Sequence, residues 1–193
     1  MTSEQLFQYA TVKIKCNEIG SALIYSPDES LDYLYIFTAK HCLLGKKFDQ
    51  TFVNTDITIE KIYNPSTEKW HSLTLTATDY VICSVSNVAD IALLIIPKKK
   101  IIELSGLTYP FQVVEKAGLS KECIIRGYAD FNSGKDDRPY RVVFEEEVKD
   151  KPGVILVKFD GSLDTRHQSA VSNVQGLSGG GLFTEIKDIG LCI

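Results

Sequence analysis

The sequence lacks the features that mark secreted, membrane-spanning and metal-binding proteins. Its 193 residues include five cysteines, an odd number without a C-x-x-C pair, so neither a disulfide framework nor a zinc site is indicated. No apolar run approaches the roughly 18 residues of a membrane span, and the first residues lack the basic start and apolar core of a secretion signal. We therefore expect a cytoplasmic protein with reduced thiols, no metal, no cofactor and no membrane partner.

An excess of basic residues is also missing. The net charge is −4 and the pI is about 5.4, which argues against nucleic acid as a partner. The one basic run, Lys98-Lys99-Lys100, is interpreted as a solvated linker. With 44% hydrophobic and 24% charged residues, the composition is that of an ordinary globular protein. No internal repeat or low-complexity tract is present.

Short β-rich segments follow one another along the chain, with no amphipathic helical windows between them. A short helix is expected at Ser3 to Gln8, and Gly20 to Tyr25 should form a hairpin with Tyr33 to Thr38. The segment from Pro97 to Pro110 is the best internal boundary. This cadence predicts an all-β barrel or sandwich. The other predicted strands are Tyr9 to Cys16, Thr55 to Ile62, Ser72 to Ser84, Asp90 to Ile96, Phe111 to Val114, Cys123 to Tyr128, Tyr140 to Val148 and Val154 to Phe159.

A serine enclosed by glycines, Ser178, is the most informative position. Residues 176–180, G-L-S-G-G, are not followed by the lysine of a phosphate-binding loop. They also match the G-x-S-x-G elbow of α/β-hydrolases, but those enzymes place their histidine after the serine and no histidine follows here. The remaining chemistry is a serine nucleophile whose base and acid lie upstream, in the order His, Asp, Ser.

Four segments resemble the sequence boxes of one enzyme family. Residues 38–42, T-A-K-H-C, are similar to the T-A-A-H-C box of the chymotrypsin/trypsin family of serine proteases, and residues 90–94 are identical to its usual D-I-A-L-L. Residues 176–182, G-L-S-G-G-G-L, resemble its G-D-S-G-G-P-L, and residues 20–24, G-S-A-L-I, resemble the strand before the histidine box. The order and separations match the family over nearly the whole chain.

The resemblance implies a fold of two six-stranded antiparallel β-barrels. Residues 1–100 would form the first barrel, with His41 as general base and Asp90 as its partner. Residues 101–193 would form the second, with Ser178 as nucleophile. The backbone N–H groups of Gly176 and Ser178 would form the oxyanion hole. His71 and His167 have no recognisable flanks and are interpreted as surface residues.

The chain departs from the family at several positions. Leu177 stands where trypsin-like zymogens have an acidic residue that pairs with a new N-terminal amine, so activation by N-terminal cleavage is not expected. Ser172, a small neutral residue, and Gln175 would line the substrate pocket, which disfavours a strict Lys/Arg preference. Relatives continue beyond Ile193 for two strands and a helix. Either this chain is the N-terminal domain of a longer protein, which we favour, or those elements are missing, the second barrel is truncated and the site is incomplete.

Two functions remain open from the sequence. The first is a serine endopeptidase acting on a protein or peptide substrate through an acyl-enzyme intermediate. A weaker resemblance, to domains that head multidomain bacterial defence proteins, implies further domains or a regulatory partner. The alternative is an inactive protease-fold module used for recognition or assembly. The three intact boxes favour the enzyme, because a binding module has no need of all three.

Overall fold

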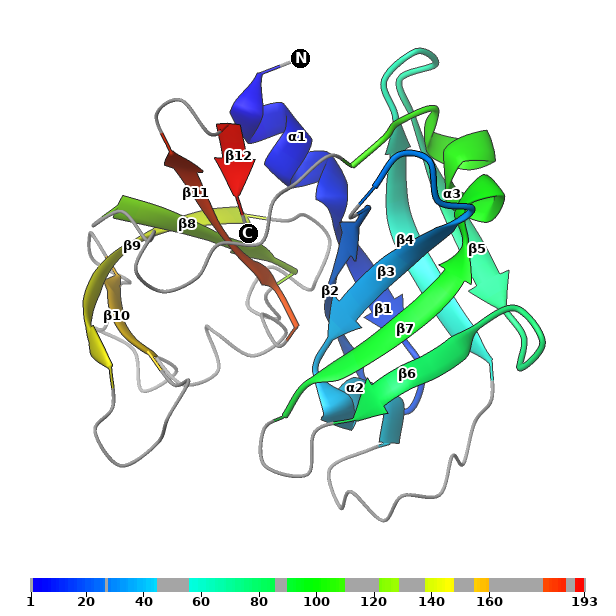
Figure 1. Ribbon diagram of the computed structural model, residues 1–193, viewed down its shortest axis with the longest axis horizontal. Helices are drawn as coiled ribbons and strands as arrows, with labels where there is room; N and C mark the ends of the chain where they lie inside the picture. The colour runs from blue at the N-terminus through cyan, green and yellow to red at the C-terminus, as the bar shows by residue number, and fades with distance from the viewer. Residues whose placement is uncertain are drawn as a thin grey trace.

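Two antiparallel sheets, packed side by side, make up most of the computed structural model (Figure 1). It describes residues 2–26, 28–44, 56–85, 90–109, 122–128, 138–147, 155–159, 179–186 and 190–192. The protein is mostly β, as predicted, with three helices in these ranges. The elements are α1 (Ser3–Ala10), β1 (Thr11–Lys15), β2 (Ile19–Tyr25), β3 (Tyr33–Thr38), α2 (Lys40–Leu44), β4 (Ile57–Asn64), β5 (Lys69–Leu75), β6 (Val81–Val85), β7 (Ala92–Pro97), α3 (Lys98–Ser105), β8 (Glu122–Gly127), β9 (Arg138–Glu147), β10 (Ile155–Phe159), β11 (Gly181–Ile186) and β12 (Gly190–Cys192).

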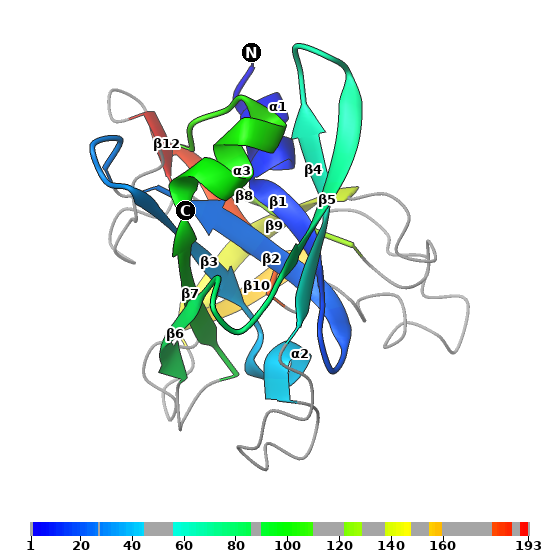
Figure 2. The same cartoon turned by 90° about the vertical axis from the view of Figure 1, so that its right-hand side faces the viewer.

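The larger sheet has seven strands in the order β5-β4-β1-β2-β3-β7-β6. It curls into a half-barrel, with α2 and α3 at opposite ends (Figures 1 and 2). Strand β3, predicted from its aromatic and β-branched residues, alternates in its burial: Leu34, Ile36 and Thr38 are buried, while the residues between them are partly exposed. The predicted hairpin of β2 and β3 is confirmed by antiparallel pairs from Ala22 with Thr38 to Tyr25 with Tyr35.

The single strand predicted from Ser72 to Ser84 is wrong. The chain forms two strands, β5 and β6, because a turn interrupts it. The Asp79 carboxylate accepts hydrogen bonds from the Thr76 N–H and hydroxyl, both at 2.9 Å, and the Asp79 N–H donates to the Thr76 carbonyl at 2.8 Å. Asp79 therefore closes the turn with its side chain, as Asp residues commonly do in turns.

The interpretation of Lys98-Lys99-Lys100 as a linker is also wrong, because these residues form the first turn of α3. Lys100 Nζ lies 2.7 Å from the Asp79 carboxylate. This Lys100 contact, with the Thr76 bonds, lowers the pKa of Asp79 to about 2. The helix ends at Gly106, whose φ of 65° is the left-handed conformation common at helix C-termini. The lysines thus begin a helix that covers one end of the sheet.

The smaller sheet has five strands in the order β10-β9-β8-β11-β12. The predicted strands β8, β9 and β10 are confirmed, whereas β11 and β12 were not predicted. The predicted strand at Phe111 to Val114 lies outside the described residues. Strand β11 pairs with β8, and Gly181 lies opposite Arg126. The chain segment that follows Ser178 is therefore joined to the centre of this sheet.

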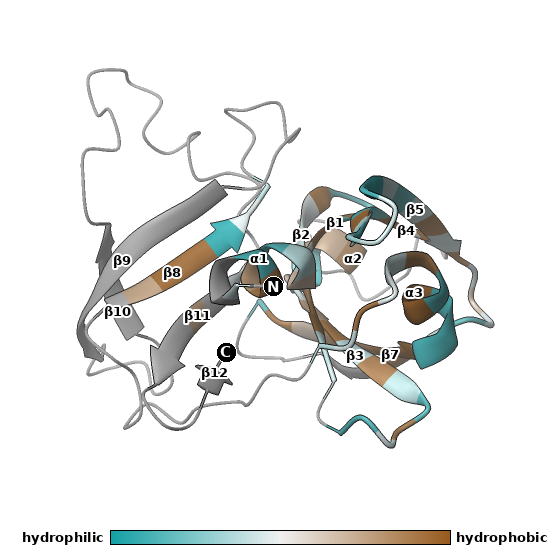
Figure 3. Cartoon of the chain, turned by 90° about the horizontal axis from the view of Figure 1, so that it is seen from above, coloured by the Kyte–Doolittle hydropathy of each residue, from teal (hydrophilic) through white to brown (hydrophobic). Residues whose placement is uncertain are grey.

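Helix α1 lies over the junction of the two sheets (Figure 3). The predicted helix is present but extends to Ala10, so the strand predicted from Tyr9 begins at Thr11. Tyr9 stays helical because its ring stacks on Tyr63 at 4.6 Å. Phe7 packs on Phe183 of β11, with the ring centroids 4.5 Å apart. The rings of Phe7 and Phe183 are buried. Helix α1 thus packs on the larger sheet through Tyr9 and on the smaller sheet through Phe7.

None of the helices in the described part of the chain is long and apolar enough to cross a membrane.

Candidate active site

Strand register brings the predicted histidine and aspartate together. Strands β3 and β7 are antiparallel, and Thr38, at the end of β3, lies opposite Ala92, at the start of β7. His41 comes three residues after Thr38, and Asp90 comes two residues before Ala92. Because β3 ends beside the start of β7, the two side chains meet at this end of the strands although 49 positions separate them in the sequence.

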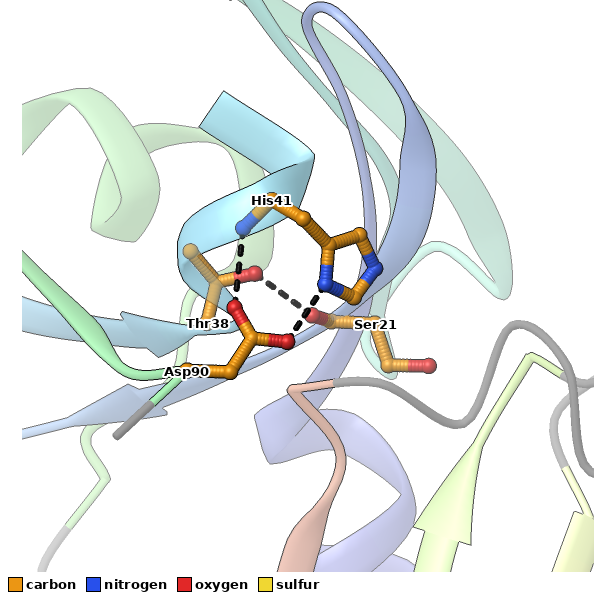
Figure 4. A network of polar contacts seen from close by, with 4 residues as sticks. All are labelled: Ser21, Thr38, His41 and Asp90. Carbon is orange, nitrogen blue, oxygen red and sulfur yellow. Dashed lines mark hydrogen bonds and ion pairs between the residues drawn. The ribbon is translucent and has the colours of Figure 1, made fainter. Parts of the chain in front are cut away.

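Asp90 makes two contacts with His41, one through each carboxylate oxygen (Figure 4). Oδ1 accepts the backbone N–H of His41 at 3.0 Å, and Oδ2 lies 2.5 Å from the ring Nδ1. A carboxylate only accepts hydrogen bonds, so Nδ1 carries the proton and a neutral ring keeps Nε2 as an acceptor. The contacts fix both the ring and its tautomer, as a general base requires.

The site is reachable from solvent. The side chains of His41 and Asp90 are 19% and 43% exposed, so neither is sealed in the core. A base must meet its substrate, and this exposure leaves room for that. His71, by contrast, lies on the edge strand β5, opposite Ile62 of β4, and takes no part in the pair.

Helix α2 holds His41 in place because its last turn is anchored to the turn between β1 and β2. The backbone N–H groups of Asn17 and Glu18 both donate to the Cys42 carbonyl, at 3.1 and 3.2 Å, and the Asn17 side-chain amide donates to the Leu43 carbonyl. Carbonyls at a helix C-terminus lack partners within the helix, so these donors satisfy them. This five-residue helix was not predicted from the sequence.

Cys42, next to His41, is a structural thiol in this arrangement. It is fully buried, and burial raises the pKa of its thiol to about 12. Cys16 lies close by, with its Sγ 3.7 Å from the Leu43 carbonyl, and both residues are thiols in the structure. The thiolate is the nucleophilic form of cysteine, and at neutral pH Cys42 holds very little of it.

We expect Cys42 to resist alkylation in the folded protein. With a pKa of about 12, the thiolate fraction rises only well above pH 8, and burial blocks the reagent as well. Iodoacetamide treatment at pH 8, followed by peptide mass spectrometry, should leave Cys42 unmodified until the protein is denatured. Cys16, which is partly exposed, serves as the internal comparison. Equal modification of the two native thiols would contradict the burial of Cys42.

The serine segment is described from Gly179 onward. Ser178, Gly176, Ser172, Gln175 and His167 lie outside the described residues. Gly179 has a φ of 82°, and a Cβ built on it would lie 2.2 Å from the Ser21 carbonyl oxygen and 2.7 Å from the Ala39 nitrogen. Only glycine combines this backbone conformation with such a close approach. The segment that follows Ser178 therefore touches the residue two before His41.

Sequence reasoning missed the polar residues behind the catalytic candidates. Thr38 donates its hydroxyl hydrogen bond to the Ser21 carbonyl at 2.8 Å, and the Ser21 hydroxyl accepts the Tyr128 N–H at 2.8 Å. Thr38 and Tyr128 therefore bind the same residue of β2, Ser21. The contacts of Thr38 and Tyr128 each involve a backbone group, which carries no residue-specific signal. Only the position of Thr38 in the T-A-K-H-C segment could have drawn attention to it.

Comparisons with known proteins identify the fold. No protein-family model matches the chain, and no curated protein has a significantly similar sequence. Among solved structures, Deg5 superposes with a TM-score of 0.57 at 18% identity, over 93% of this chain and 76% of Deg5. AlgW, an HtrA-type protease solved with a tripeptide, gives 0.56 at 14% identity, over 100% of this chain and 57% of AlgW. The inactive form of the Rv3671c protease of M. tuberculosis gives 0.52 at 18%, over 93% of this chain and 74% of that one.

These similarities define the fold of the chain, which is chymotrypsin-like, as in the trypsin-like serine proteases on which it superposes. The structures it resembles are of the HtrA and Deg type. Identities of 14 to 18% establish the fold alone, so the chemistry has to be argued from the residues of this chain.

Proposed function

We propose that this chain is a serine endopeptidase that hydrolyses peptide bonds with Ser178 as nucleophile, His41 as general base and Asp90 as the partner of His41. The observation that carries the proposal is the contact of Asp90 with Nδ1 of His41. That contact leaves Nε2 to accept the proton of a serine hydroxyl, which is a poor nucleophile at neutral pH without a base.

The contacts of Gly179 support Ser178 as the nucleophile. Adjacent Cα atoms across a trans peptide are about 3.8 Å apart, so Ser178 cannot be far from Gly179. Gly179 in turn lies against Ala39 and Thr38, which lead directly into the helix of His41. A serine next to this glycine is therefore a reasonable partner for the imidazole.

The proposed reaction has two halves. His41 takes the Ser178 proton as the hydroxyl attacks the carbonyl carbon, and the N–H groups of Gly176 and Ser178 stabilise the oxyanion, each by about 3 kcal/mol. His41 then donates the proton to the leaving amine, which gives the acyl-enzyme. A water molecule then attacks the ester carbonyl as His41 takes its proton, and His41 returns that proton to the Ser178 oxygen as the carboxylic acid product leaves. Throughout, Asp90 stabilises the imidazolium.

We also propose that the two sheets represent two β-barrels, formed by residues 1–100 and 101–193. In support, the two sheets share no strand among the described residues, and helix α3 separates the last strand of the larger sheet, β7, from the first strand of the smaller sheet, β8. Ser172 and Gln175 would line the pocket, and Leu177 would make activation independent of a new N-terminal amine. The domain would act on a protein or peptide in the cytoplasm as the N-terminal effector of a larger protein, such as one used in bacterial defence.

The test is covalent labelling with a fluorophosphonate probe, which reacts with activated serines. We expect stoichiometric labelling of the wild-type protein and none of Ser178→Ala, with peptide mapping placing the adduct on Ser178. The Ser178→Ala protein should melt within a few degrees of the wild type, which shows that the fold is intact. Absence of labelling in the wild-type, full-length protein would refute the endopeptidase and favour the inactive binding module.

A further inference from the structure

Three segments distant in the sequence meet at Ser21 of β2. They are the end of β3, which leads to His41, the residue after β8, and the segment that follows Ser178. Ser21 is fully buried, so its contacts are made away from water. A polar group buried in this way depends on its protein partners. The Ser21 carbonyl accepts a hydrogen bond from Thr38, and the Ser21 hydroxyl accepts one from Tyr128.

The first contact is made by Thr38. Its hydroxyl donates to the Ser21 carbonyl at 2.8 Å, and Thr38 itself is only 2% exposed (Figure 4). Ala22 and Thr38 already lie opposite each other in the sheet, so this bond is an additional link between β2 and β3 at the point where β3 ends. It fixes the backbone three residues before His41.

The second contact joins Ser21 to the smaller sheet. The Ser21 hydroxyl is directed away from Thr38 (Figure 4) and accepts the N–H of Tyr128 at 2.8 Å. Tyr128 follows β8, the strand that pairs with β11, and its own hydroxyl reaches the Thr11 carbonyl at 3.4 Å. The strand that leads into His41 and the sheet that holds Gly181 are thus tied to the same serine.

Gly179 lies against the first of these two contacts. A Cβ at this position would lie 2.2 Å from the Ser21 carbonyl oxygen and 2.8 Å from the Thr38 hydroxyl oxygen. The hydrogen-bonded pair of Thr38 and Ser21 is therefore the surface on which the backbone after Ser178 rests. A change in the separation of Thr38 and Ser21 would move that backbone relative to His41.

We propose that Thr38 and Ser21 are positioning residues, which set the separation of His41 and Ser178 through the Thr38 hydroxyl and the Ser21 carbonyl. This inference rests on the proposed function. It does not give Thr38 any contact with substrate: the residue acts through the backbone of Gly179 and through its own link to His41. Misplacement of a catalytic group by about 1 Å can cost about 100-fold in rate.

The test compares two substitutions at Thr38. Thr38→Val keeps the shape and removes the hydroxyl, whereas Thr38→Ser keeps the hydroxyl. Thr11→Val is a matched control, because Thr11 is also fully buried and its hydroxyl donates to the Phe7 carbonyl at 2.9 Å and not to Ser21, while its backbone carbonyl is kept. The readouts are the rate constant of fluorophosphonate labelling as a function of pH and the thermal midpoint.

We expect Thr38→Val to lower the plateau of the pH–rate profile by about 10- to 100-fold, because the reacting groups are misplaced. The midpoint of the profile should not move. Thr38→Ser should stay within about threefold of the wild type, and Thr11→Val should melt like Thr38→Val but label at nearly the wild-type rate. Equal labelling rates for Thr38→Val and Thr38→Ser would overturn the positioning role. Equal slowing of Thr38→Val and Thr11→Val would also overturn it. Neither result would contradict the proposed endopeptidase. A wild-type protein that does not label would refute both proposals.

Discussion

Replacement of Asp90 by asparagine is expected to lower kcat/KM for a peptide substrate by about 10⁴-fold, the size of effect seen when the aspartate of such a triad becomes an amide. Asparagine can still accept the His41 N–H through its oxygen, where Asp90 Oδ1 now lies at 3.0 Å. Its NH₂ group then faces Nδ1, where it donates a hydrogen bond. The ring proton moves to Nε2, which can no longer take a proton from Ser178.

The expected signature is a loss of rate without a loss of fold. Asp90→Asn should melt close to the wild type, because the backbone contact and the side-chain volume are retained. Asp79→Asn is the matched control: it removes the charge of an aspartate in the turn between β5 and β6, one that pairs with Lys100 and closes that turn. Its kcat/KM should remain within about twofold of the wild type. A kcat/KM for Asp90→Asn within tenfold of the wild type would contradict the catalytic role of the pair.

Replacement of Gly179 by alanine should reduce both stability and activity. The added carbon would lie 2.2 Å from the Ser21 oxygen and 2.7 Å from the Ala39 nitrogen, both backbone atoms that cannot rotate away. The left-handed φ costs an alanine about 1 to 2 kcal/mol, and overpacking adds about 1 to 3 kcal/mol. We expect a destabilisation of about 2 to 5 kcal/mol, measured by urea denaturation, and a labelling rate at least about 100-fold lower.

Gly106→Ala separates the cost of the left-handed φ from the cost of overpacking. Gly106 has a similar positive φ of 65°, but a Cβ there would meet nothing within 4 Å. Its substitution should cost about 1 to 2 kcal/mol, the cost of the left-handed φ alone, and leave labelling unchanged. If Gly179→Ala were no more destabilising than Gly106→Ala and labelled at the wild-type rate, the close approach of Gly179 to Ser21 and Ala39 would be disproved.

The pairing of His41 with Asp90 could be predicted because both residues lie in segments with distinctive flanks. The T-A-K-H-C segment follows a strand and the D-I-A-L-L segment begins one, and both strands are continuous runs of apolar and β-branched residues, which favour β structure. The curled β scaffold could be predicted for the same reason, since the strands of the first half are bounded by turn residues. Features that depend on neighbouring residues in the chain can thus be predicted from the sequence.

The missed features depend on contacts between distant segments. Tyr9 has strong β propensity but is helical because it stacks on Tyr63, 54 positions along the chain, and this packing outweighs the local preference. Lys98-Lys99-Lys100 has no apolar periodicity of its own, yet it forms a helical turn that Lys100 ties to Asp79. The link from Thr38 to Ser21 uses a main-chain carbonyl, which every residue possesses. No sequence pattern encodes such a partner.

The packing of α1 against β11 bears on how the chain matures during synthesis. Phe7 is synthesised 176 positions before its partner Phe183. Translation adds about 5 to 20 residues per second, so this apolar face of the helix waits roughly ten seconds or more for its partner. Gly179 arrives in the same late stretch. The chain therefore completes His41 and Asp90 early but cannot bring the serine segment to them until synthesis has passed β11. If the proposed function holds, this delay keeps the unfinished chain inactive beside other newly made proteins.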